Sequence, residues 1–190
     1  MTPSTPRPRT ALDEEIDAAG AAGAGATTAL VAAMGASVLR AAAHATDDGA
    51  GIAAQAEALQ ARLTSLAEAN ADAYERARRG LAGDLSGDGQ EERDRALREL
   101  LHEAASVPAS IADAAADVAV LGELLALHGA PHTRPDAEAV AVLAAGSARA
   151  SAVLVGVNLT EGDDGPLARR ARAAAARAQG CADRAVRSDP

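Results

Sequence analysis

Residues 136–159 read DAEAVAVLAAGSARASAVLVGVNL, and this stretch decides the fold class. Alanine, the strongest helix former, recurs throughout it together with valine and leucine, and no proline interrupts it. Only Asp136, Glu138 and Arg149 carry a charge. We therefore expect the most apolar helix of the protein over residues 136–159, at a central position or at a subunit interface.

The rest of the chain has the same small-residue character. It holds 55 alanines among its 190 residues, and Tyr74 is its only aromatic residue. A core of alanine, valine and leucine lets helix axes approach closely, so the composition predicts an all-α, compact bundle of about six helices. Because such a core buries little apolar area per residue, association into a homodimer would stabilise it further.

The helical pattern predicts a single domain. Residues 1–11 are expected to form a disordered lead-in, and residues 12–187 form the domain. The stretch Gly20–Gly25 interrupts the helical pattern near its start. The pair Val107-Pro108 indicates a kink or a helix boundary. The apolar periodicity predicts helices over residues 12–19, 26–46, 52–79, 136–159 and 167–186. It also predicts helical structure on both sides of Pro108, ending at Gly129.

Charge and rare residues exclude several function classes. The 18 basic residues are all arginine, against 27 acidic ones, and the net charge of −9 argues against a nucleic-acid partner. The absence of lysine excludes Schiff-base catalysis and a lysine-bearing phosphate loop. The single Cys181 and four scattered histidines predict neither a disulfide nor a metal site. Charged residues within the longest apolar runs predict a soluble, cytoplasmic protein with no membrane partner.

Three polar interruptions of the apolar pattern are candidate sites. The first, GAGATT at residues 23–28, opens the second predicted helix, and its backbone N–H groups could receive an anionic ligand group. The alternative is that Thr27 or Thr28 caps the helix while the glycines only bend the chain.

The second interruption is GAPHTRPD at residues 129–136, and the third is Asn158. His132 and Asp136 could form a proton-transferring pair for acid–base chemistry near neutral pH. Capping alone also explains Asp136, because a carboxylate in the first turn stabilises a helix. The Asn158 carboxamide, in an apolar helix, must find hydrogen-bond partners in the core or on a ligand.

Five segments, taken in order, resemble the cyclodeaminase/cyclohydrolase family, which includes the C-terminal domain of formiminotransferase-cyclodeaminase and stand-alone methenyltetrahydrofolate cyclohydrolases. The resemblance extends over most of the chain, from about residue 12 to residue 185. The segments are GAGATTALVAAMGA (23–36), LAEANADAY (66–74), Arg93 leading to Val107-Pro108, GAPHTRPD (129–136) and VGVNL (155–159).

The resemblance implies an all-helical homodimer that binds a tetrahydrofolate derivative near the subunit interface, with no tightly bound cofactor. The substrate would be a methenyl form, which is hydrolysed, or a formimino form, which loses ammonia. Asp136 would carry proton transfer, and Asp136 and Asn158 would meet in one pocket lined by two subunits. His132 is an addition to the family pattern that could take over proton transfer. The implied substrate-binding residues are Gly23, Gly25, Thr27, Asn70, Arg93 and Asn158.

The chain departs from the family pattern at several polar positions. Ala24 and Ala26 replace a glycine and the hydroxyl of the usual Gly-Gly-Gly-Ser turn, and Asn70 stands where an Asp is expected. Each lost hydrogen-bonding group weakens folate recognition by about 1 kcal/mol or more. Two further interpretations therefore stay open: a relative recruited to another small cyclic or iminium-like substrate, and a non-catalytic helical dimer that serves as a scaffold.

Overall fold

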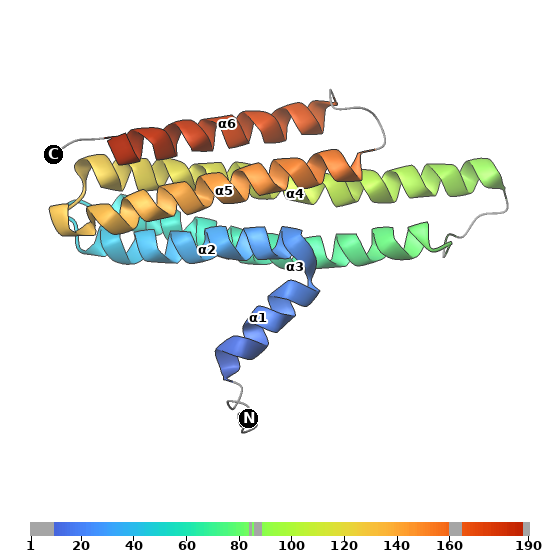
Figure 1. Ribbon diagram of the computed structural model, residues 1–190, viewed down its shortest axis with the longest axis horizontal. Helices are drawn as coiled ribbons and strands as arrows, with labels where there is room; N and C mark the ends of the chain where they lie inside the picture. The colour runs from blue at the N-terminus through green and yellow to red at the C-terminus, as the bar shows by residue number, and fades with distance from the viewer. Residues whose placement is uncertain (1–9, 84, 86–88, 160–164, 188–190) are drawn as a thin grey trace, which may run out of the picture.

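The computed structural model describes residues 10–83, 85, 89–159 and 165–187, and within these residues the protein is all-α. Figure 1 shows long helices stacked side by side into an elongated bundle. The predicted all-α bundle of about six helices is confirmed. The elements are α1 (Ala11–Ala21), α2 (Gly23–His44), α3 (Ala50–Leu81), α4 (Gln90–His128), the short 3-10 helix η1 (Pro131–Thr133), α5 (Arg134–Asn158) and α6 (Pro166–Arg187).

The four helices α2 to α5 form the body of the bundle. Each packs against its neighbour along the chain, and α2 also packs against α5, so that the four close into a ring. Helix α6 covers α4 and α5, and Figure 1 shows α6 running in the same direction as α4. Helix α1 packs mainly against α2 and projects away from this body (Figure 1).

The core is made mostly of alanine, as the composition predicts. Its few larger side chains that are fully buried include Leu39, Leu63, Ile111 and Leu125. At Gly122 in α4 the backbone of α5 comes close, since an added Cβ would stand 3.0 Å from the carbonyl oxygen of Ala137 in α5. The apolar helix predicted over 136–159 is α5, which packs against α2, α4 and α6.

Two helix boundaries differ from the sequence prediction. Helix α4 runs without interruption through Pro108, so this proline marks no boundary between two helices. The glycine-rich interruption is confined to Ala22, and Gly23–Gly25 already belong to the first turn of α2. A left-handed conformation at Gly23, with φ of +87°, reverses the path between α1 and α2.

The start of the domain also lies slightly earlier than predicted. Thr10 caps α1, since its hydroxyl accepts a hydrogen bond from the Asp13 backbone N–H while the Asp13 carboxylate accepts one from the Thr10 N–H. Ala11 is therefore helical rather than part of a disordered lead-in. The rest of that predicted lead-in, residues 1–9, lies outside the described residues.

Three ion pairs fasten α6 to α4. Arg170 pairs with Asp113 at 2.6 Å, and Arg177 pairs with Asp117 at 2.9 Å. In the third pair, the Arg184 Nη2 donates to the Glu123 carboxylate at 2.8 Å. The three arginines are spaced seven residues apart, so they share one face of α6. This face of α6 is therefore an inter-helix contact.

Two segments are long and apolar enough to cross a membrane by length and composition, Gly23–His44 and Pro131–Asn158. Both contribute to the buried core of the bundle, and core helices of soluble proteins pass the same test.

Candidate functional site

A cavity of about 220 Å³ lies where α2 begins and α5 ends, against the middle of α3 and α4. The first turn of α2 forms one wall through Gly23, Ala24 and Gly25. Two carboxamides, from Asn70 and Asn158, also line it. The remaining lining residues are Tyr74, Ala104, Pro108, Leu154 and Val157.

The Asn70 side chain is the most unusual feature of this cavity. It is buried with only 7% of its surface exposed, on the inner face of α3. No hydrogen bond joins its carboxamide to any residue that the structure describes, and its polar atoms are not sealed from the cavity. A buried amide without a partner costs free energy, so its donor and acceptor are available to a ligand.

Gly25 makes room for this carboxamide. A Cβ built at Gly25 would overlap the Asn70 side-chain nitrogen, oxygen and carbon. A larger residue at this position would therefore push the Asn70 side chain aside, although the backbone of Gly25 is ordinary helix. The contact explains why the GAGATT segment and Asn70, which are far apart in sequence, form one wall.

Asn158 compensates for Pro108. Proline has no N–H, so Pro108 leaves the Ala104 carbonyl, four residues earlier in α4, without its helical hydrogen bond. The Asn158 Nδ2 donates to this carbonyl oxygen at 2.9 Å. The Asn158 carboxamide thus stabilises α4 at Pro108, and it also lines the cavity. Both alternatives for Asn158, a core partner and a ligand contact, agree with this position.

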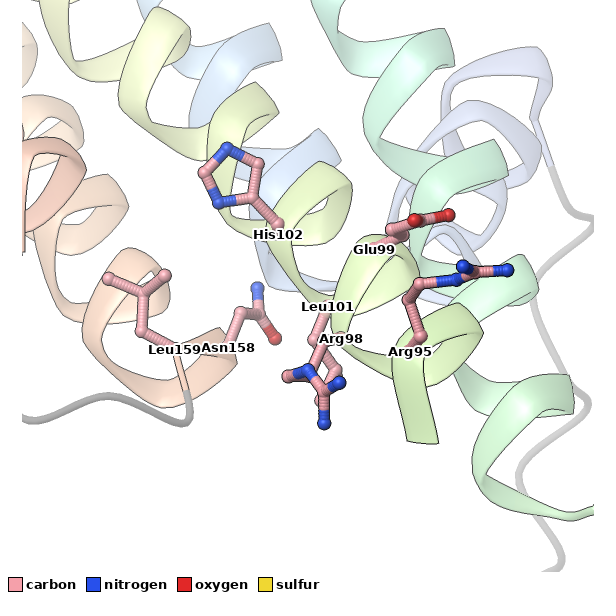
Figure 2. A pocket seen from close by; sticks show the side chains of 7 residues that line it. All are labelled: Arg95, Arg98, Glu99, Leu101, His102, Asn158 and Leu159. Carbon is pink, nitrogen blue, oxygen red and sulfur yellow. The ribbon is translucent and has the colours of Figure 1, made fainter. Parts of the chain in front are cut away.

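A second, more open cavity of about 360 Å³ adjoins the first, and Asn158 lines both. Figure 2 shows its side chains projecting from the N-terminal half of α4 and from the end of α5, with Asn158 turned toward α4. Its lining residues are Arg95, Arg98, Glu99, Leu101, His102, Asn158 and Leu159. An imidazole and a carboxylate thus stand next to the carboxamide-lined cavity.

The structure brings together four of the six predicted substrate-binding residues, Gly23, Gly25, Asn70 and Asn158. Thr27 lies outside the cavity. Its hydroxyl is directed at the carbonyl oxygens of Gly23 and Ala19, at 3.1 and 3.2 Å, and so ties α2 to α1. Arg93 is exposed near the start of α4 and lines neither cavity.

Neither Thr27 nor Thr28 caps α2. The Thr28 hydroxyl donates to the carbonyl of Gly25 at 2.8 Å, inside the helix, and the N-cap Ala22 makes no side-chain hydrogen bond. The capping interpretation was wrong because the helix begins before the threonines, so their hydroxyls bond back to the preceding turn.

Asp136 and His132 lie at the opposite end of the bundle from both cavities. Asp136 is exposed in the first turn of α5, and His132 is exposed in η1. Because α5 is one continuous helix, the 22 residues from Asp136 to Asn158 separate them by about 33 Å. Within one chain they therefore do not share a pocket. No hydrogen bond joins His132 to Asp136 in the part of the chain that the structure describes.

Sequence reasoning missed the lining residues of the second cavity. Glu99 and His102 lie on the N-terminal half of α4, and the end of α5 makes this surface a cavity wall. Spacing along α4 was the available signal, since Arg95, Arg98 and His102 recur at intervals of three and four residues.

The other polar chemistry of the chain lies away from the cavities. Burial, and next a hydrogen bond with Glu123, raise the pKa of the Cys181 thiol to about 11, so it is a neutral core group and not a nucleophile. In residues 10–83, 85, 89–159 and 165–187, no three His, Cys, Asp or Glu side chains gather closely enough to hold a metal ion.

Comparison with known proteins now identifies the fold and the family. The family model described as formiminotransferase-cyclodeaminase matches residues 10–177. The chain belongs to the formiminotransferase-cyclodeaminase family. At that level it is a folate-related one-carbon enzyme. The family match covers every residue of both cavities, including Asn70 and His102.

A solved structure shares the fold of this family member. It is the crystal structure of formiminotetrahydrofolate cyclodeaminase from Thermotoga maritima, with a TM-score of 0.79 and 24% sequence identity. The match covers 93% of this chain and 94% of the other. Among curated proteins, the comparison finds no match.

Proposed function

We propose that this chain acts on a tetrahydrofolate that carries a one-carbon group, either by hydrolysing the methenyl form or by deaminating the formimino form. The observation that carries the proposal is the buried, unpartnered Asn70 carboxamide in the cavity formed with Gly25 and Asn158. A pterin ring presents paired donors and acceptors along one edge, and an amide matches such an edge. Family membership supports the substrate class.

Both reactions concern a carbon that joins two nitrogens. Hydrolysis adds water to this carbon, and a base must take a proton from the water while an acid later protonates the leaving nitrogen. Deamination instead closes a ring: the second folate nitrogen forms a bond to this carbon and loses its proton to a base. The bond to the departing nitrogen breaks after an acid has protonated that nitrogen, and ammonia is released. Within one chain, we propose that His102 and Glu99 supply these protons, because they stand in the cavity that adjoins Asn158.

The experiment measures turnover of both substrates by the purified protein. Methenyltetrahydrofolate loses its absorbance on hydrolysis, and formiminotetrahydrofolate releases ammonia. The account predicts that at least one rate exceeds the buffer blank and that His102→Ala lowers it about 100-fold, the usual contribution of a proton-transferring side chain. His128→Ala, an exposed histidine at the far end of α4, is the matched control and should turn over normally. Rates equal to the blank for both substrates would contradict the proposal.

Asp136 has a separate test, because only a second copy could bring its carboxylate to the cavity. If two chains form the site, Asp136→Asn abolishes turnover while helicity and dimer mass stay unchanged. If turnover survives, the carboxylate only stabilises the first turn of α5. Turnover of His132→Ala is measured in parallel. Loss of turnover in both variants would indicate that the two residues act as a pair, and loss in Asp136→Asn alone would indicate that Asp136 acts without His132.

A second candidate function follows from the apolar lining of the same cavity. Ala24, Leu154 and Val157 line it with apolar side chains, and Asn70 carries no charge. Such a cavity also suits a smaller cyclic or iminium-like substrate. A thermal-shift screen tests this alternative, because a ligand that binds the native state raises the melting temperature.

We also propose that the chain works as a homodimer. Large apolar side chains on the neighbouring helices α2 and α5 are exposed, namely Met34, Val38, Val142 and Leu143. Soluble monomers rarely expose contiguous apolar patches of this kind. Sedimentation equilibrium of the full chain tests the proposal, and a mass of one chain at micromolar concentration would contradict it.

A further inference from the structure

Helix α1 is an amphipathic helix whose apolar stripe is uncovered. None of its residues is buried, and it packs mainly against α2. Leu12 and Ile16 lie one turn apart on the same face, 62% and 60% exposed. An isolated helix of eleven residues is marginal in water, so its apolar stripe needs a surface to pack against.

The charges on α1 all have one sign. The helix carries Asp13, Glu14, Glu15 and Asp17, and no basic residue. At 100° per residue, Asp13 lies on one side of the Leu12–Ile16 stripe and Glu15 lies on the other. A complementary surface would therefore be an apolar groove with a basic group on each wall.

Such a groove lies between α5 and α6. Its floor and rim are apolar, with Val153 and Val157 exposed by 61% and 75%. Arg149 from α5 and Arg172 from α6 stand on its two walls. The complete lining is Arg149, Ala152, Val153, Gly156, Val157, Ala168, Arg172 and Ala175.

We propose that α1 of a second copy of this chain docks in the α5–α6 groove. Leu12 and Ile16 then cover Val153 and Val157, and Glu15 beside the stripe faces Arg149. The lengths agree, because residues 12–19 extend over about 10 Å along α1 and residues 149–157 over about 12 Å along α5.

The occupant is a second copy because the path of the chain directs α1 away from its own groove. Figure 1 shows α1 leaving the bundle on the side opposite to α6. The direction is fixed by Gly23, with φ of +87°, and by the contact of the Thr27 hydroxyl with the Ala19 carbonyl. Exchange of α1 between two chains would be symmetric, so each copy would both give and receive a helix.

The inference builds on the proposed homodimer and adds which surfaces meet. It also concerns the site, because Val157 lines both the groove and the carboxamide-lined cavity. A docked α1 would therefore lie beside the cavity of its partner.

A disulfide between two differently marked copies tests the inference. One copy carries Ile16→Cys, and the other carries Val153→Cys and a mass tag; the natural Cys181 is buried and does not compete. After mixing and mild oxidation, the expected product is a disulfide between the two different copies. In the matched control, Leu127→Cys replaces Val153→Cys; Leu127 is also exposed but lies at the other end of the bundle, and no such product is expected.

Each other outcome overturns the inference in a recognisable way. A chain that carries both Ile16→Cys and Val153→Cys can be oxidised at high dilution. A disulfide within that chain would show that α1 folds back on its own groove. Absence of the mixed disulfide in a protein that sediments as a dimer would exclude the α1 contact and leave the homodimer standing. A monomeric mass would exclude both.

Charge reversal gives an independent readout. Arg149→Glu places a carboxylate opposite the acidic helix and should weaken dimerisation at least tenfold at low salt, with the loss fading as salt is raised. Glu15→Arg in the same chain should restore part of the affinity. An unchanged dimer dissociation constant for Arg149→Glu would contradict the charge match.

Discussion

At the scale of single residues, Pro108 and Asn158 act as a pair across two helices. The proline frees the Ala104 carbonyl, and the asparagine, 50 residues later, donates to it at 2.9 Å. Asn158 therefore has a structural reason to stand at the end of α5. The same hydrogen bond orients the carboxamide at the junction of the two cavities.

A double-mutant cycle tests this pairing. Asn158→Ala alone leaves the Ala104 carbonyl without a donor and should lower the free energy of unfolding by about 1–3 kcal/mol. With Pro108→Ala present, residue 108 regains an N–H for that carbonyl, so Asn158→Ala should cost about 1 kcal/mol less. Denaturant unfolding of the four proteins measures the cycle. Equal costs in both backgrounds would show that the two residues are independent.

Gly25 offers a second prediction at this scale. Gly25→Ala forces a methyl group into the Asn70 carboxamide and should destabilise the fold by about 1–3 kcal/mol. Gly51→Ala, on a helix position with open space around it, should be neutral or slightly stabilising, as alanine is the better helix former. Thermal unfolding compares the two. A stable Gly25→Ala protein would mean that Asn70 moves freely.

The chemistry of these residues was only partly predictable. A glycine-rich turn and an asparagine in an apolar helix each draw attention in the sequence, because each is costly without a reason. Their mutual contact was not predictable, because Gly25 meets Asn70 only through the crossing of α2 and α3. The hydrogen bond between Asn158 and Ala104 likewise depends on how far α5 extends along α4.

At the scale of helices, the α4–α6 ion pairs give a pH-dependent prediction. The hydrogen bond with Arg184 is the largest cause that lowers the pKa of Glu123 from its ordinary value of 4.5. A carboxylate with a lowered pKa stabilises the fold above the unfolded-state value, and this stability is lost as pH falls through the folded-state value. Acid should therefore weaken the attachment of α6.

Glu123→Gln removes the charge from that pair. The variant should lose about 1 kcal/mol at neutral pH, a modest value because Arg184 is largely exposed, and the difference should shrink as pH falls below about 4.5. The control Glu57→Gln disrupts an exposed pair with Arg40 at 3.9 Å and should change stability by only a few tenths of a kcal/mol. A pH-independent loss would assign the effect to packing instead of charge.

Helix content was the most predictable property at this scale. Alanine content and three-four periodicity identify five of the six helices to within a few residues, since both are local signals. Pro108 was the exception: a proline disfavours a helix interior, but tertiary packing and the Asn158 donor maintain α4 through it. A rule based on neighbouring residues cannot predict a hydrogen-bond donor that lies 50 residues away in the sequence.

At the scale of the whole molecule, the site is placed by the antiparallel course of α4 and α5. The two ends of α5 were both candidate sites in the sequence, and the long straight helix keeps them about 33 Å apart. One end, with Asn158, lies against Gly25 and Asn70. The other, with Asp136, is exposed, so the order of motifs along a chain does not by itself show which of them meet.

The central claim is that the cavity between Gly25, Asn70 and Asn158 holds a tetrahydrofolate. Calorimetric titration with 5-formyltetrahydrofolate, an analogue that keeps the ring system, tests it most directly. The account predicts saturable binding by the natural chain, at least tenfold weaker binding by Asn70→Ala, and unchanged binding by Glu68→Ala on the exposed face of α3. Equal affinity of Asn70→Ala and the natural chain, or no binding at all, would contradict it.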